Sequence, residues 1–253
     1  MKSLFTCGGS EAVLFAFMSC LNPGDEIIVP EPAYANYMSF AISAGAVIRT
    51  VTTTIEEGFC LPKVEKFEEL INERTKAILI CNPNNPTGYL YTQKEMNQIR
   101  DLVKKYNLYL FFDEVYREFI YMGSPYISAM HLEGIEQNVI LIDSVSKRYS
   151  ECGIRIGALI TKNEAVRKTV MKFCAWCLSD FRYKDETTET LKPSGHNLNV
   201  VAETIMMAPA AGFYTTHELG KNQVRLAYVL CKEDIQRALM ILEKAIEKYA
   251  EKK

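Results

Sequence analysis

The first part of the chain alternates short apolar runs with longer amphipathic segments, from Glu11 to about Thr161. Short apolar runs bounded by turn residues are typical of buried strands, whereas apolar residues that repeat every three or four positions are typical of helices. Thr92 followed by Glu95 also predicts a capping box at one helix start. The pattern predicts an α/β fold with a mostly parallel sheet sandwiched by helices. The predicted strands are 26–29, 47–51, 77–81, 109–112, 139–142 and 156–160, and the predicted helices are 11–20, 34–44, 64–72, 93–106 and 164–173.

The pattern changes after about Phe173. Residues 180–199 are polar and lack a clear period, which predicts an exposed loop or a partly disordered segment. Strand-like runs follow at 204–207 and 223–230, and a final helix is predicted at 233–249. The C-terminal part is therefore predicted to be α+β, without the alternation of strands and helices that precedes it.

Charge and hydropathy narrow the classes of partner. The 29 Lys and Arg against 31 Asp and Glu give a formal net charge of -2, so the chain has no basic surplus for a nucleic-acid backbone. No apolar run approaches the roughly 20 residues that cross a bilayer. The Gly8-Gly9 pair comes too early for a signal peptide. We expect small-molecule partners, no membrane or nucleic-acid binding, and a cytoplasmic location.

Eight cysteines are scattered through apolar stretches, which favours reduced packing residues over a disulfide framework. Cys174 and Cys177 form a CxxC pair, but a structural zinc site needs a second pair of ligands. The three histidines, His131, His196 and His217, have no metal-ligand spacing. We therefore expect no metal site and interpret the CxxC pair as helix packing.

Polar residues directly follow three predicted strands. A turn rich in Pro and Asn at 82–88 follows strand 77–81, Asp113 follows strand 109–112, and Lys147 lies just beyond strand 139–142. Ligands of α/β proteins bind beyond the carboxyl ends of strands. Each feature alone has an ordinary explanation, as a turn, a helix N-cap or a solvated lysine. Their convergence at one sheet edge favours a functional site.

With these segments in place, the chain resembles the class I/II aminotransferases, the aspartate-aminotransferase superfamily of fold-type I pyridoxal-phosphate enzymes. Single motifs are weak signals, but their joint order and spacing make coincidence very improbable. The resemblance implies the large domain of a pyridoxal-phosphate-dependent transferase. It is carried by the segments 8–12, 22–25, 30–34, 82–88, 113–116, 144–157 and 224–226.

The resemblance implies a role for each residue around the cofactor ring. Lys147 holds pyridoxal 5'-phosphate as a Schiff base and moves the proton between the substrate Cα and the cofactor's C4′. Asp113 binds the protonated pyridine nitrogen, which keeps the ring an electron sink. Asn85 and Tyr116 hydrogen-bond the phenolic oxygen, and Tyr34 stacks on the ring. Lys147, Asp113 and Tyr34 are thus the candidate catalytic residues.

The same resemblance places the cofactor phosphate at the start of helix 11–20. Gly8, Gly9 and Ser10 offer backbone N–H groups there, and a helix N-terminus favours an anion. The Ser144 hydroxyl and the Arg155 guanidinium complete the phosphate site, because arginine offers a fork matched to phosphate oxygens.

Arg225 is the candidate ligand of the substrate's α-carboxylate, as a bidentate pair. The implied activity is transfer of an amino group between an amino acid and a 2-oxo acid, in a family whose members form homodimers. The same cofactor residues also serve lyases that break C–S or other bonds at Cβ or Cγ. A third possibility is a shortened chain that binds the cofactor, or pairs with a full-length homologue, without turnover.

The chain departs from the family in length. The family's N-terminal segment and much of its small domain have no counterpart, and we place a deletion junction near Phe173. The expected domains are a pyridoxal-phosphate-binding large domain at 1–173 and a truncated small domain at 174–253. Because the lost segments carry side-chain specificity, no feature selects the amino donor, and the same losses threaten stability and activity.

Overall fold

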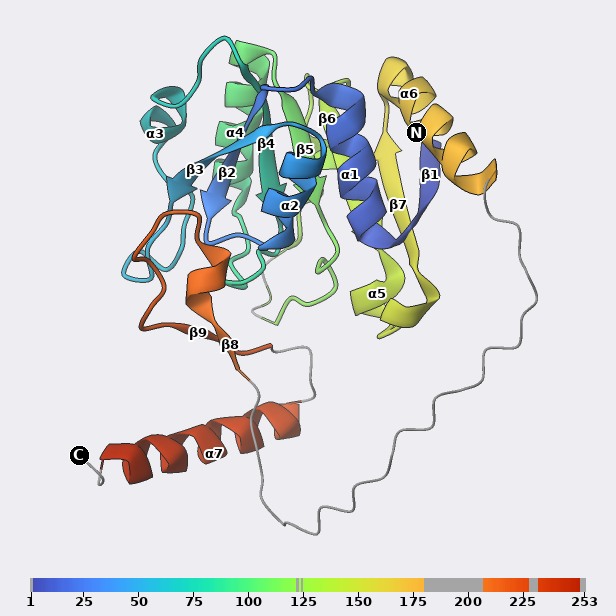
Figure 1. Ribbon diagram of the computed structural model, residues 1–253. Coiled ribbons are helices and arrows are strands. Elements are labelled where there is room, and N and C mark those ends of the chain that lie inside the picture. Colours follow the sequence, from blue (N-terminus) through green and yellow to red (C-terminus); the bar gives the residue numbers. More distant parts are fainter. Residues whose placement is uncertain (1, 122, 124, 180–206, 228–231, 251–253) are drawn as a thin grey trace, which may run out of the picture.

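A seven-stranded sheet forms the centre of the molecule in the computed structural model, which describes residues 2–121, 123, 125–179, 207–227 and 232–250 (Figure 1). Only β7 runs against its neighbours, so the sheet is mostly parallel, as predicted. The strands, in the sheet order β1-β7-β6-β5-β4-β2-β3, are β1 (Lys2–Cys7), β7 (Ile156–Thr161), β6 (Val139–Ser144), β5 (Tyr109–Asp113), β4 (Thr75–Cys81), β2 (Glu26–Glu31) and β3 (Val47–Thr52).

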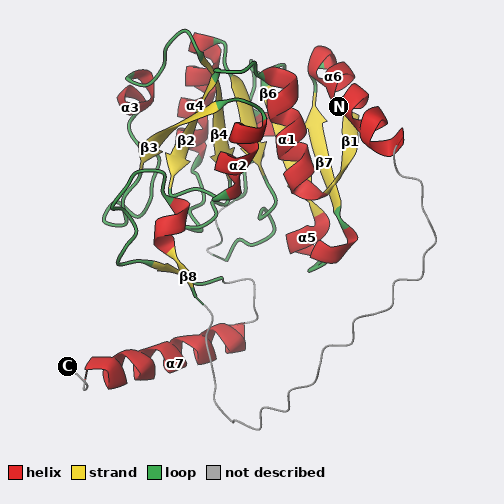
Figure 2. Cartoon of the chain, viewed as in Figure 1, coloured by secondary structure: helices red, strands yellow, loops and turns green. Residues whose placement is uncertain are grey.

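Helices cover both faces of this sheet (Figure 2). Ala77 and Leu79 of β4 belong to the core beneath α1, α2 and α6, whereas Ile78 and Ile80 belong to the core beneath α3 and α4. Alternate residues of one strand thus serve opposite cores, as the twofold repeat of a strand requires. The helices are α1 (Gly8–Cys20), α2 (Asn36–Ser43), α3 (Val64–Glu68), α4 (Gln93–Tyr106), α5 (Val145–Arg148), α6 (Glu164–Ser179) and α7 (Lys232–Ala250).

The capping box predicted at the start of α4 is present. The Thr92 hydroxyl accepts from Glu95 N at 3.3 Å, and Glu95 Oε2 accepts from Thr92 N at 2.7 Å. Glu95 Oε1 also accepts from Leu61 N at 2.9 Å, which ties the preceding loop to the same cap. One predicted pattern therefore fixes both a helix start and a loop.

Several boundaries differ from the prediction. The strand β1 and the four-residue helix α5 were not predicted, and α6 continues past Phe173 to Ser179. The predicted helix 64–72 is wrong in length, because the chain leaves the helix after Glu68 and Asn72 turns to donate to Glu26 Oε2 at 2.8 Å. Cys174, on α6, packs against the core beneath α1.

The C-terminal part contains little sheet. The two strands β8 (Ala208–Pro209) and β9 (Val224–Arg225) pair antiparallel, and the 3₁₀ turn η3 (Ala210–Phe213) follows β8. The predicted strand 223–230 is too long, since only two of its described residues are in a strand; residues 228–230, 204–206 and 180–199 lie outside the described part. Helix α7 confirms the predicted 233–249 and lies apart from the sheet in Figure 1.

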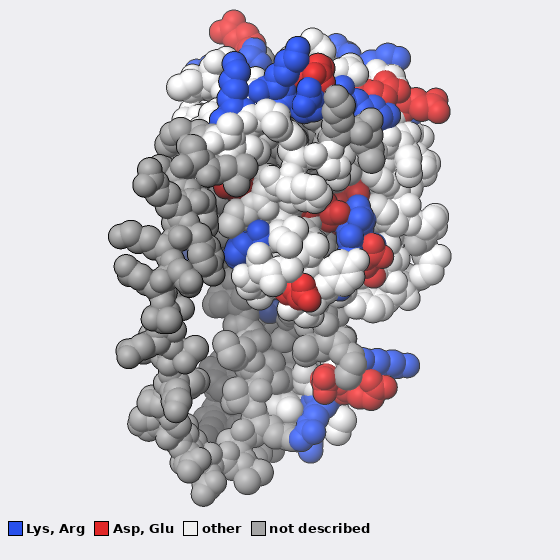
Figure 3. Space-filling view, turned by 90° about the vertical axis from the view of Figure 1, so that its right-hand side faces the viewer, with Lys and Arg blue, Asp and Glu red and all other residues white. Residues whose placement is uncertain are grey.

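The edge of the sheet at β1 is exposed. Figure 3 shows the side of the molecule that carries β1 and α6, where Lys and Arg gather at the top and the middle is mostly uncharged. Phe5 of β1 is 78% exposed, and Ile156 of β7, which lies opposite Cys7 of β1, is also exposed. In the described residues, no helix has the length and apolar character of a membrane span.

Candidate active site

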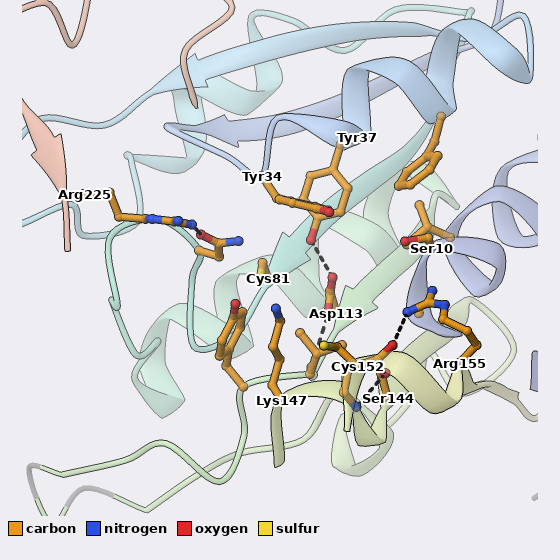
Figure 4. Close-up of a pocket in the computed structure, with 17 residues that line it drawn as sticks. Ser10, Tyr34, Tyr37, Cys81, Asp113, Ser144, Lys147, Cys152, Arg155 and Arg225 are labelled. Atoms are coloured by element: carbon orange, nitrogen blue, oxygen red, sulfur yellow. Dashed lines mark hydrogen bonds between the residues drawn. The ribbon is translucent and has the colours of Figure 1, made fainter. Parts of the chain in front are cut away.

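A cavity of about 370 Å³ opens where the parallel strands reach their carboxyl ends. Each predicted site residue except Gly8 lines it, although these residues come from strands, helices, loops and the C-terminal segment (Figure 4). The predicted residues that line it are Gly9, Ser10, Tyr34, Asn85, Asp113, Tyr116, Ser144, Lys147, Arg155 and Arg225.

Lys147 projects into this cavity from the short helix α5 (Figure 4). Its Nζ lies 6.0 Å from the centre of the Tyr116 ring. Ser144 caps the helix by accepting from Ser146 N at 3.1 Å, and Arg148 Nη2 pairs with Asp143 Oδ1 at 3.1 Å. The residues on both sides of Lys147 are thus fastened to the end of β6.

Asp113 lies at the base of the cavity and is 6% exposed. Its Oδ2 accepts from the Tyr37 hydroxyl at 2.6 Å and its Oδ1 accepts from Val115 N at 3.1 Å. Burial raises the pKa of the Asp113 carboxyl, and these hydrogen bonds oppose that shift. No Lys or Arg of the described residues forms an ion pair with it, so a cationic ligand atom fits this position.

Tyr37 is a site residue that the sequence reasoning missed. It belongs to α2, three residues after Tyr34, and the two rings meet edge to face with centroids 5.4 Å apart. Burial has the largest effect on the pKa of Tyr37, and the nearby Asp113 charge adds to it. Together they raise this pKa well above its usual value, so the Tyr37 hydroxyl stays a proton donor. The predicted helix 34–44 contained both tyrosines, so their spacing of three was the available signal, although Tyr34 lies before the start of α2 in the structure.

One end of the cavity is suited to a phosphate. Helix α1 begins there with no side-chain cap, which leaves first-turn N–H groups for an anion. The Arg155 guanidinium lies against Gly8, where an added Cβ would approach Nη2 to 2.2 Å. Arg155 also donates to the carbonyls of Cys152 at 2.9 Å and Cys7 at 3.3 Å, which hold it in place.

Gly157 explains how these parts come so close. A Cβ at this position would lie 2.3 Å from the carbonyl carbon of Gly8 and 2.6 Å from Gly9 N. Real Cβ atoms do not make such contacts, so β7 approaches the start of α1 only because residue 157 is glycine. Gly157, two residues after Arg155, is therefore part of the anion site although it offers no side chain.

Arg225 lies at the opposite end of the cavity from Arg155 (Figure 4). Its Nη1 donates to Asn85 Oδ1 at 3.3 Å, and its guanidinium carbon lies 5.1 Å from the centre of the Phe213 ring. Its Nε is buried with no hydrogen-bond partner among the described residues. A buried unpaired donor of this kind fits a carboxylate ligand.

The Lys147 amine thus lies between the two ends of the cavity, which carry Arg155 and Arg225. The buried Asp113 carboxylate lines the same cavity. A ligand with a phosphate at one end, a carboxylate at the other and a cationic ring nitrogen between them would satisfy all of these groups. The Lys147 amine lines the same cavity, and an amine is a nucleophile for a carbonyl carbon.

Protein sequences and structures similar to this chain agree with that geometry. The family model for aminotransferase class I and II matches residues 1–180. The chain is 36% identical over 167 residues to an aspartate aminotransferase of Thermotoga maritima, and 36% identical over 154 residues to a putative aminotransferase of Bacillus subtilis. These matches cover 66% and 61% of this chain.

Solved structures give the same result for the fold. The T. maritima aspartate aminotransferase aligns with a TM-score of 0.66 at 34% identity, over 70% of this chain and 46% of that chain. The Thermus thermophilus aspartate aminotransferase with maleate aligns with a TM-score of 0.63 at 30% identity, over 67% and 44% of the two chains. The sheet flanked by helices thus confirms the predicted transferase fold.

The extent of these matches differs between the chain and its relatives. The matched segments span 44% of the T. maritima protein and 39% of the B. subtilis protein, which is less than half of their length. Within this chain, however, the family match includes the three glycines of the anion site (Gly8, Gly9 and Gly157), together with Asp113, Lys147 and Arg155. By this match and these relatives, the chain belongs to the class I and II aminotransferase family.

Proposed function

We propose that this chain binds pyridoxal 5'-phosphate and transfers an amino group between an amino acid and a 2-oxo acid. The observation that carries the proposal is the position of Lys147 and Asp113 in one cavity, between Arg155 and Arg225. When bound, the cofactor supplies an electron sink for the negative charge that develops at the substrate's Cα.

The residues present fit this cofactor. The buried Asp113 carboxylate has no cationic partner among the described residues, and a protonated pyridine nitrogen would supply one. The first turn of α1, together with Arg155 and the Ser144 hydroxyl, offers donors for its phosphate. The unpaired Nε of Arg225 leaves a donor for the carboxylate of the amino acid.

Each side chain then has a task. Lys147 Nζ would hold the cofactor as a Schiff base and, when released by the substrate, carry the proton from the substrate's Cα. The Tyr34 ring would cover one face of the cofactor, and Asn85 and Tyr116 would donate to its phenolic oxygen. Tyr37 would hold the Asp113 carboxylate in place through its 2.6 Å hydrogen bond.

We further propose a cytoplasmic homodimer, with amino acids and 2-oxo acids as the small-molecule partners. The exposed apolar side chains at the β1 edge support a covered surface in solution, since Phe5 is 78% exposed. The two-domain division near residue 173 remains part of this proposal. Sedimentation measurements of the full chain would test the dimer directly.

The test of the activity begins with the protein purified in the presence of pyridoxal phosphate. We expect a visible absorption band of a lysine-bound cofactor, which disappears in Lys147→Ala. Adding amino acids one at a time should convert this band, and 2-oxoglutarate should restore it. A spectrum that matches free cofactor and is unchanged by Lys147→Ala would overturn the proposal.

The same experiment separates the two alternatives. Pyruvate or ammonia released without a 2-oxo acid acceptor would indicate a C–S or β-lyase. A lysine-bound cofactor that no amino acid converts would indicate a cofactor-binding remnant.

A further inference from the structure

Glu31, the last residue of β2, has a buried carboxylate that is not part of the cavity lining. The residue is 1% exposed, and its two oxygens accept from four donors. Thr52 Oγ1 donates to Oε1 at 2.8 Å, and Thr216 Oγ1 donates to the same oxygen. The backbone N–H groups of Thr215 and Thr216 donate to Oε2 at 2.8 and 3.2 Å. Three of these four donors belong to the C-terminal segment.

The other polar contacts between this segment and the sheet domain are few. In the described part of residues 207–227, the segment is further tied by a bond from Ala33 N to the Phe213 carbonyl at 2.8 Å. Arg225 itself donates to Asn85 at 3.3 Å, which is a long hydrogen bond. Glu31 thus supplies most of the polar attachment of the segment that carries Arg225.

The segment is stiff enough to transmit this attachment from Thr216 to Arg225. The Tyr214 hydroxyl donates to Gln223 Oε1 at 2.9 Å, and Ala210 N donates to the Gln223 carbonyl at 3.0 Å. The β8–β9 pairing then places Arg225 opposite Ala208. A displacement at residues 215–216 therefore displaces the guanidinium at the cavity.

The charge of Glu31 matters as well as its shape. No Lys or Arg in the described part of the chain forms an ion pair with it, so backbone and hydroxyl donors alone stabilise the charge. A carboxylate accepts at both oxygens, whereas an amide would direct an N–H₂ group toward one set of these donors. A buried anion held by donors of another segment is a strong attachment.

We infer that Glu31 is a positioning residue, which holds Arg225 at the cavity by anchoring residues 215–216. The inference rests on the proposed function for the role of Arg225 as ligand of the substrate carboxylate. Loss of this anchor weakens carboxylate binding, while the cofactor residues on the sheet keep their places.

Glu31→Gln is the variant that tests the anchor, and Glu26→Gln is its matched control. Glu26 begins the same strand, is 2% exposed and pairs with Arg74 at 3.2 Å, far along β2 from the C-terminal segment. Thr216→Val is a milder second variant, which removes one hydroxyl donor should Glu31→Gln fail to fold. All are made in the full chain loaded with pyridoxal phosphate.

Two measurements are needed. The first is the affinity for maleate, an unreactive dicarboxylate, from its effect on the visible spectrum. We expect Glu31→Gln to weaken maleate binding about tenfold, which is about 1.4 kcal/mol. In single-turnover reactions, the amino-acid concentration for half-maximal rate should rise while the rate at saturation stays unchanged. The second is hydrogen exchange of residues 207–227, which should become faster in Glu31→Gln and in Thr216→Val but not in Glu26→Gln.

The outcomes separate this inference from the proposed function. If wild-type protein responds to maleate and Glu31→Gln responds equally, with unchanged exchange, the anchor is overturned. If wild-type protein never binds the cofactor through lysine, the proposed function fails, and the exchange measurement alone decides whether Glu31 anchors the segment. A saturating rate that falls as much as the affinity would show that Glu31 acts on the cofactor instead.

Discussion

The two ends of the cavity are built in different ways. The Arg155 end is made by the sheet itself, where β7 lies against the first turn of α1 with a spacing that only glycine allows. The Arg225 end is made by a separate C-terminal segment, attached through Glu31 and a few other hydrogen bonds. The proposed cofactor contacts thus lie within the sheet domain, whereas the proposed substrate contact depends on hydrogen bonds between residues 184 and 185 positions apart.

The glycines show the same contrast. A Cβ at Gly157 would meet backbone atoms of Gly8 and Gly9, whereas a Cβ at Gly212, in the C-terminal segment, would meet no atom within 4 Å. The Arg155 end of the cavity, made by the sheet, therefore has no space for an added Cβ at Gly157, whereas the C-terminal segment that makes the Arg225 end has space at Gly212. Substitutions should therefore be costly at one end and tolerated at the other.

Gly157→Ala should have the largest effect. Its methyl group would force backbone apart, so we expect a loss of about 3 kcal/mol in the free energy of unfolding, together with loss of the lysine-bound cofactor band. Gly212→Ala should change stability by less than about 0.5 kcal/mol. Urea unfolding and the visible spectrum measure both. Equal effects of the two substitutions would remove the contrast between the ends.

Asp113→Asn should have the next largest effect. It should weaken cofactor binding but stabilise the cofactor-free protein. It removes the only proposed partner of the pyridine nitrogen, so the cofactor affinity should fall roughly hundredfold or more. Arg225→Lys, at the other end, should leave the cofactor affinity unchanged. Equilibrium dialysis with pyridoxal phosphate measures both affinities.

In the cofactor-free protein the stability effect follows from the pKa. Burial raises the pKa of Asp113 above its ordinary 3.8, so the folded state binds this proton more tightly than the unfolded state. The resulting stabilisation is complete below pH 3.8 and is lost as pH rises through the raised pKa. Asp113→Asn should therefore be more stable than wild type near pH 7, with the difference shrinking toward pH 4. A difference independent of pH would contradict this assignment.

Most of the sheet end could be predicted from sequence, because its residues directly follow strands. Asp113 ends β5 and Lys147 lies three residues beyond β6, so a correct reading of the apolar runs was enough to bring them together. The strand β1 was missed because the predicted pattern began at the helix after it. Its pairing with β7 is visible only in three dimensions.

The segment end was predictable only in part. Arg225 was identified through the resemblance, but the predicted strand 223–230 was too long, since apolar β-branched residues favour a strand without supplying a partner to pair with. Glu31 carried no local signal, because its donors Thr215 and Thr216 lie far along the chain. Contacts between residues so far apart in the sequence are set by tertiary packing, and no local pattern of apolar and polar residues predicts them.

Tyr37→Phe should have the smallest effect and the most specific one. The buried Tyr37 hydroxyl lowers the pKa of Asp113 through its hydrogen bond, against the larger effect of burial. Without it, Asp113 takes up its proton at a higher pH. We expect about a fivefold loss of cofactor affinity, about 1 kcal/mol, and an acid limb of binding that moves to higher pH.

Tyr34→Phe is the matched control for Tyr37→Phe, because the Tyr34 hydroxyl accepts from Asn36 at 2.6 Å and has no bond to Asp113. Dialysis with pyridoxal phosphate at several pH values should show the shifted acid limb only in Tyr37→Phe. The same shift in both variants would mean that loss of either hydroxyl moves the acid limb, and would argue against a specific role of the Tyr37–Asp113 hydrogen bond. A shift in Tyr37→Phe alone means that the sheet end sets the charge of Asp113 as well as its position.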